Sequence, residues 1–114
     1  MFASAFRGQI FVVSRPKLPG LPHVGLLLPD DSIVHCTPER GTHRSSPEEF
    51  ARGFDVRVVR EVPAELYGAI MQRVYWIERN PRPYDLIKFN CFHFVNWLTA
   101  QTQPEAVGRP LWSS

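Results

Sequence analysis

Two apolar runs separated by a short turn constrain the fold of this 114-residue chain more than any other feature. Residues 23–28 read His-Val-Gly-Leu-Leu-Leu, residues 29–31 read Pro-Asp-Asp, and residues 32–36 read Ser-Ile-Val-His-Cys. Short runs rich in β-branched and other apolar residues are typical of strands when residues such as proline and aspartate bound them. The sequence therefore predicts a β-hairpin over residues 23–36.

The register of this hairpin decides where two histidines lie, because side chains alternate between the two faces of a strand. A three-residue turn pairs Gly25 with His35, and His23 and His35 then share one face. A two-residue turn sends the two histidines to opposite faces. Pro29 cannot donate a ladder hydrogen bond, which favours its place in the turn. We therefore expect His23 and His35 together on one face and Cys36, as a structural residue, on the other.

The rest of the chain predicts an α+β fold, in which a small antiparallel β-sheet packs against helices on one side. Strands are expected from β-branched runs, and helices from apolar periodicity and capping residues. Besides the hairpin, the expected elements are a strand over residues 8–13, a proline-rich loop over 14–22, a polar loop over 37–45, a short helix over 46–52, a strand over 55–60, a helix from 63 to about 80, and a last helix from 90 to about 101.

Length and composition exclude several classes of protein. A chain of 114 residues with 44% apolar residues predicts one globular domain over 1–114. A net charge of +2 without basic runs argues against a nucleic-acid partner. No segment is apolar enough for a transmembrane anchor, and residues 1–7 are too short for a signal peptide. The sequence thus predicts a cytoplasmic protein, or one exported without such a signal.

Cofactors and disulfides are not expected either. The two cysteines do not make a disulfide framework, and the spacing of cysteines and histidines is not that of a zinc site. No glycine-rich phosphate-binding loop is present, so we expect neither a metal nor an organic cofactor. The sequence does not indicate an oligomeric state.

A cysteine at the start of a helix is the first candidate for chemistry. Asn90 is a good N-cap, which places Cys91 at the first helical position. The free amides and the positive end of the helix dipole gather there and favour thiolate over thiol. Cys91, Phe94, Val95 and Leu98 share the buried face of this helix. Cys91 is therefore either a placed nucleophile or a small buried hydrophobic residue without a chemical role.

The two hairpin histidines supply the other parts of a thiol catalytic site. Cys91 is the expected nucleophile, and His23 the base that takes the thiol proton and returns one to the leaving group. His35 is expected to hydrogen-bond the second ring nitrogen of His23 and fix its tautomer. The backbone amide of Cys91 is a candidate oxyanion donor.

Other polar residues have weaker claims to a site. Arg15 is a candidate substrate-binding cation at the mouth of a cleft. His43 lies in the polar loop over residues 37–45, and we interpret it as a solvated residue. His93 lies two positions after Cys91, so it points away from the buried face of the helix and is interpreted as structural.

Residues 90–95, Asn-Cys-Phe-His-Phe-Val, resemble the N-C-E-H-F-V motif of the lecithin retinol acyltransferase-like family. This family belongs to the circularly permuted branch of the NlpC-type papain-like fold. The twelve-residue step from His23 to His35 across a hairpin and the Arg-Pro pair at residues 15–16 are also similar to the family pattern. The resemblance covers roughly residues 8–100.

This resemblance implies a cysteine enzyme that carries an acyl group as a thioester. Residue by residue, it implies that Cys91 is the nucleophile, His23 the base and His35 the orienting residue. Phe92 and Gln9 depart from acidic residues common in the family, and the C-terminal hydrophobic anchor of animal members is absent. The related PPPDE-type isopeptidases usually lack the second histidine, so His35 favours the acyltransferase-like branch.

Three functions follow as hypotheses. The first is a cofactor-free acyl hydrolase or acyltransferase that acts on a lipid ester or other small acyl substrate. The second is an amidase or peptidase of the same fold, which cuts a peptidoglycan or isopeptide bond. The third is a catalytically silent module that keeps the cleft for binding.

Overall fold

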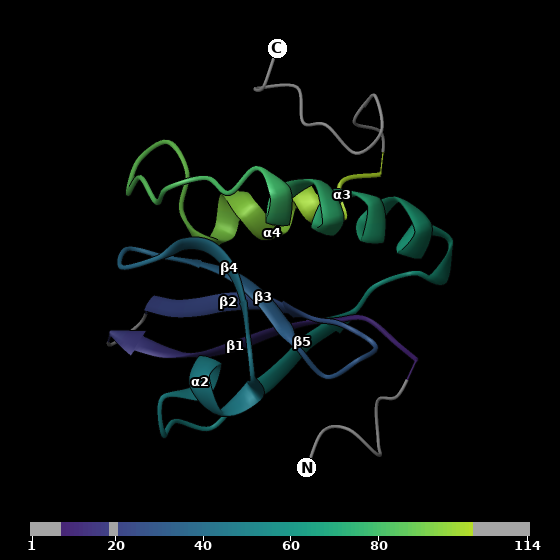
Figure 1. Cartoon of the computed structure of the whole chain (residues 1–114). Helices are drawn as coiled ribbons and strands as arrows, with labels where there is room; N and C mark the ends of the chain where they lie inside the picture. The colour runs from purple at the N-terminus through teal and green to yellow at the C-terminus, as the bar shows by residue number, and fades with distance from the viewer. Residues whose placement is uncertain (1–7, 19–20, 102–114) are drawn as a thin grey trace.

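Within residues 8–18 and 21–101, which the computed structural model describes, five antiparallel strands form one sheet in the order β4-β3-β2-β1-β5 (Figure 1). The strands are β1 (Phe11–Leu18), β2 (Leu21–Leu27), β3 (Ile33–Thr37), β4 (Gly41–Ser45) and β5 (Arg57–Glu61). The helices are α2 (Pro47–Ala51), the 3-10 turn η1 (Ala64–Leu66), α3 (Tyr67–Arg79) and α4 (Cys91–Thr99). The expected α+β class is therefore confirmed.

The predicted hairpin register is correct. Leu26 pairs with Val34 and Leu27 with Ile33, and the amide of Leu28 donates to the Ser32 carbonyl at 2.9 Å. The turn thus has three residues, and its last residue takes a left-handed conformation with φ 68°. A three-residue hairpin loop that ends in a left-handed residue is a common solution for this spacing.

Two segments predicted as loops are strands. β1 continues past residue 13 and includes Pro16. Pro16 lies opposite Pro22, next to the point where the β1–β2 register shifts. Neither proline therefore removes a hydrogen-bond donor from a regular part of the ladder. β4 is built from a polar run, and a reversal at Gly41, with φ 68°, returns the chain antiparallel to β3. A polar edge strand gains its hydrogen bonds from its neighbour, and its own composition does not predict it.

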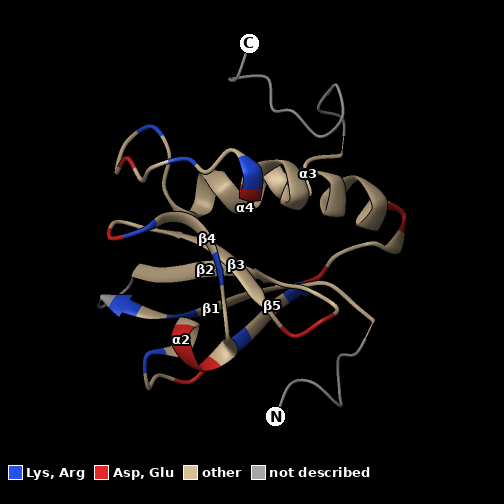
Figure 2. Cartoon of the chain, viewed as in Figure 1, with Lys and Arg blue, Asp and Glu red and all other residues tan. Residues whose placement is uncertain are grey.

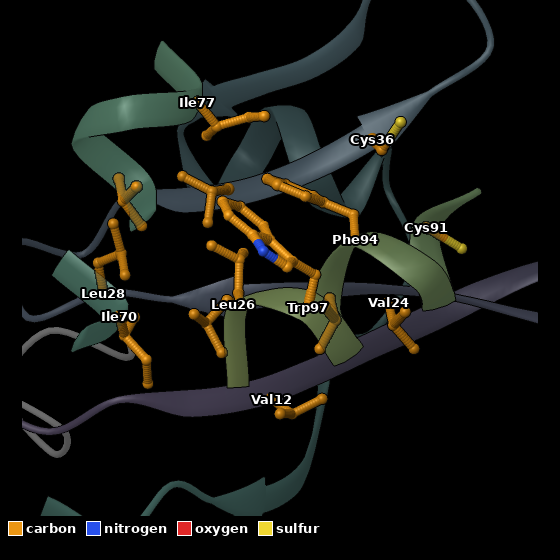
Figure 3. Packing of buried hydrophobic residues seen from close by; sticks show 14 of the residues in the cluster. Val12, Val24, Leu26, Leu28, Cys36, Ile70, Ile77, Cys91, Phe94 and Trp97 are labelled. Carbon is orange, nitrogen blue, oxygen red and sulfur yellow. The ribbon is translucent and has the colours of Figure 1, made fainter. Parts of the chain in front are cut away.

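Helices cover both faces of the sheet, whereas the sequence predicted helices on one side only. α3 and α4 lie along one face, and the short α2 lies on the other (Figure 1). The α3–α4 face holds the larger core cluster, which includes Val24, Leu26, Cys36, Cys91 and Phe94 (Figure 3). The α2 face holds a smaller cluster made of Phe11, Val13, Leu27, Ile33 and Phe50.

No helix in the described ranges is both long and apolar enough to cross a bilayer. Residues 1–7, where no signal peptide was expected, lie outside the described part of the chain.

Candidate functional site

His23 and His35 form a buried, hydrogen-bonded pair on the α2 face of the sheet. His23 Nε2 lies 2.8 Å from His35 Nδ1, and the two side chains are only 2% and 3% exposed. The two rings meet edge to face with centroids 5.1 Å apart. The expected contact between the two histidines is therefore present, as the hairpin register required.

The hydrogen bonds of Ser45 favour one direction for the hydrogen bond between these two histidines. The Ser45 hydroxyl lies 3.0 Å from His35 Nε2 and can donate to the Ser46 carbonyl at 3.2 Å. When the hydroxyl donates its hydrogen bond to that carbonyl, its oxygen accepts a hydrogen bond from His35 Nε2. A neutral His35 then accepts at Nδ1 from His23 Nε2. This assignment leaves His23 Nδ1 without a proton, as a base requires.

Burial keeps both rings neutral. Desolvation lowers the pKa of His23 to about 3, with Arg15 as the next cause. Desolvation also lowers the pKa of His35 to about 2, with His43 as the next cause. A buried imidazole surrounded by cations loses its charged form, because no carboxylate compensates it. At neutral pH both rings are therefore unprotonated.

Phe50 of α2 packs beneath both imidazoles. Its ring stacks on His23 with centroids 5.3 Å apart and meets the edge of His35 at 5.1 Å. The helix is held by the predicted capping box, in which Ser46 accepts from the Glu49 amide and Glu49 accepts from the Ser46 amide. A Cβ atom at Gly25 would lie 2.8 Å from Phe50 Cε1, so the ring fits only against glycine.

His43 is a third histidine of this site, and its interpretation as a solvated loop residue is wrong. It lies on β4 directly opposite His35, with ring centroids 4.3 Å apart, and is half-buried. Its Nδ1 donates to the Gly41 carbonyl at 2.9 Å. Prediction of a hairpin between β3 and β4 would have placed His43 opposite His35. The polar composition of residues 41–45 did not indicate a strand, so this hairpin was not predicted.

Cys91 begins α4, as expected. The Asn90 side chain accepts from the amides of Phe92 and His93 at 3.0 and 3.2 Å. His93 Nδ1 in turn accepts from the Asn90 amide at 3.0 Å. These bonds form a reciprocal cap that fixes the start of the helix, so His93 has the structural role that was expected.

Cys91 is packed in the hydrophobic core on the α3–α4 face of the sheet. Cys91 is 4% exposed and belongs to the α3–α4 core cluster with Val24 and Cys36 (Figure 3). Val24 follows His23 directly, so their side chains leave β2 on opposite faces. Among the described residues, the hydrogen-bond partner of His23 is His35 and not the thiol. Of the expected meeting of Cys91, His23 and His35 at one point, the structure shows the contact between the two histidines, and the approach of Cys91 to them stays a prediction.

Arg15 lies beside His23, opposite it in the β1–β2 register. Its guanidinium donates to the carbonyls of Phe50 and Pro16 and lies 5.9 Å from the centre of the Phe50 ring. Burial is the largest cause of its lowered pKa, with repulsion from Arg52 next, while Cys91 acts in the opposite direction. Arg15 therefore packs on the histidine side of the sheet.

The histidine pair predicts a loss of stability in mild acid. Above pH 6.5 the rings are neutral in the folded and unfolded states, but below it the unfolded chain binds protons that the folded protein does not. The free energy of unfolding should fall as pH decreases from 6.5 towards 3, by about 1.4 kcal/mol per pH unit for each ring. Urea unfolding at a series of pH values, followed by tryptophan fluorescence, measures this slope.

The window between pH 6.5 and 5 isolates the histidines, because the carboxylates with lowered pKa values titrate below it. In the His35→Gln variant we expect the slope to fall by the share of one ring. Because burial also lowers the pKa of His43, this share is less than half of the total slope. A free energy of unfolding that stays constant over this window would show that the rings are not buried in the neutral form.

In the described ranges, no group of three or more His, Cys, Asp or Glu side chains could hold a metal ion. Comparison of the chain with protein-family models, curated proteins and solved structures found no match.

Proposed function

We propose that this chain is a cysteine-dependent acyl hydrolase or acyltransferase of the permuted papain-like type, with Cys91 as nucleophile. The observation that supports the proposal most is the neutral, oriented His23–His35 pair, whose 2.8 Å hydrogen bond leaves one imidazole nitrogen free to accept a proton. Histidine pairs with this orientation suit general base catalysis. The capped helix start at Cys91 adds the position expected of an activated thiol.

The proposed reaction has two steps. His23 Nδ1 takes the thiol proton while Cys91 Sγ bonds to the carbonyl carbon of the acyl substrate. The tetrahedral intermediate expels the alcohol or amine, which takes that proton from His23, and a thioester remains on Cys91. Water or a second alcohol or amine then attacks the thioester, again with His23 as base, and releases the thiol. The Cys91 amide, at the start of α4, is the proposed oxyanion donor.

This chemistry requires the sulfur to approach the imidazole. Proton transfer needs the two atoms within about 3 Å of each other or joined by one water, and catalytic contacts often tighten only with substrate bound. Cys91 packs in one cluster with Val24, the residue after His23, so it lies near the same part of β2. The proposed substrate complex therefore differs from the present arrangement at the start of α4.

A catalytically silent binding module is the second candidate, and the position of the Cys91 sulfur favours it. The thiol is buried with Cys36 and Val24 on the α3–α4 face. A thiol that stays there acts as a small core residue, and the His23–His35 pair then serves only the packing of β2 on β3.

Alkylation by iodoacetamide at pH 8 distinguishes the two candidates. We expect Cys91 to be alkylated at least about tenfold faster than Cys36. The His23→Gln substitution should slow the alkylation of Cys91 and not that of Cys36, because the base that removes the thiol proton is lost. Burial raises the pKa of Cys36 to about 12, so this residue serves as the internal slow control. Peptide mass spectrometry measures both rates. Slow labelling of Cys91 that does not change with His23→Gln would support the silent module.

A further inference from the structure

Arg15 carries a buried positive charge without an ionic partner among the described residues. The residue is 5% exposed, and its guanidinium donates only to two neutral backbone carbonyls, one from Nε and one from Nη1. The ion pairs in the described ranges involve Arg44 and Arg52 but not Arg15. Burial of a charge without a counter-ion is unfavourable, so an anion that reached Nη2 would be held strongly.

A cavity of about 180 Å³ adjoins this guanidinium. It is lined by three cations, namely Arg15, Lys17 and Arg52, together with His23, Thr37, Pro38, Glu39 and Phe54. Glu39 is the single carboxylate, and Arg52 binds it at 2.7 Å. Basic residues mark the end of β1 in Figure 2. With a neutral imidazole and one compensated carboxylate, the lining carries a net positive charge.

We propose that this cavity, the Arg15 cavity, is a binding site for a small oxyanion, either a carboxylate or a phosphate group. Arg15 Nη2 donates to the anion from the floor, and Lys17 and Arg52 attract it from the rim. The volume is below the roughly 300 Å³ at which pockets for whole drug-sized ligands begin, so it suits one charged group of a ligand. The site rests on the unpaired guanidinium and is independent of whether Cys91 is a nucleophile.

NMR titration of the full chain tests the site. The Nε–Hε resonance of Arg15 in the ¹⁵N-labelled protein would be followed at pH 7 and constant ionic strength against inorganic phosphate and, separately, acetate. We expect a saturable shift with at least one of them, and the tighter anion identifies the group that the cavity accepts. The Cys91→Ser variant should bind equally well, which separates this proposal from the proposed catalysis.

Rim variants keep the test informative even if replacement of Arg15 unfolds the protein. Lys17→Gln combined with Arg52→Asn should weaken binding about tenfold, since two attractive charges are lost. Asparagine suits position 52, where the backbone is left-handed with φ 50°. Arg57→Gln, at an exposed position on β5, is the matched control and should leave affinity unchanged. Shifts that are linear in both anions, or equal in wild type and rim variant, would overturn the proposal.

Discussion

Replacement of Cys91 by serine is expected to reduce turnover of an acyl ester by at least about 10³-fold. The hydroxyl is a much weaker nucleophile than the thiol, and loss of the nucleophile removes the covalent route as a whole. Release of p-nitrophenol from a p-nitrophenyl ester measures the rate. Intact-protein mass spectrometry should detect an acyl adduct on the wild type that is missing from the variant.

Cys36→Ala is the matched control, because it removes the other buried thiol of the same core cluster and leaves Cys91 itself unchanged. It should retain most of the activity, whereas His23→Gln should lose as much as Cys91→Ser. An acyl adduct formed with phosphatidylcholine would indicate a lipid ester substrate, and amine released from a muropeptide would indicate the amidase alternative. Equal activity of wild type and Cys91→Ser would exclude thiol catalysis and leave the binding module.

Phe50→Ala is expected to lower the free energy of unfolding by about 3–5 kcal/mol. The ring is fully buried, joins the α2-face cluster and packs against both site imidazoles. Its removal leaves a cavity that the rigid sheet cannot close, so lost burial and lost contacts add. Urea unfolding monitored by tryptophan fluorescence measures the change.

Phe54→Ala makes the same chemical change at a side chain that is 49% exposed and serves as the control. It should alter the free energy of unfolding by no more than about 0.5 kcal/mol. Similar small effects for the two variants would mean that α2 does not support the sheet and that the packing beneath the histidines is incidental.

The structural features that depend on residues close in sequence were predicted correctly. The proline-containing turn set the register that joins His23 to His35, and the capping residues Ser46 and Asn90 correctly marked two helix starts. These features depend on neighbours a few residues away, so a single sequence is sufficient to predict them.

Long-range packing was harder to predict. β4 consists of polar residues that become a strand only because β3 offers hydrogen bonds, so His43 was missed. The choice of face for α4 was also missed, although a signal existed. Val24, Val34 and Cys36 give β2 and β3 one face that is wholly apolar, and an apolar helix covers that face in preference to one with two histidines. Cys91, at the start of this helix, therefore packs with the apolar face.

The contact between Gly25 and Phe50 links two positions that are distant in sequence. The missing side chain at position 25 creates a recess in β2, and the aromatic ring fills it. Gly25 therefore shares one fixed volume under the site with Phe50 and Ile33, so that a methyl group gained at position 25 must be matched by atoms lost at these neighbours. Variation at these positions is thus constrained to be compensating, a larger residue at one with smaller residues at the others, for as long as the imidazoles above keep their orientation.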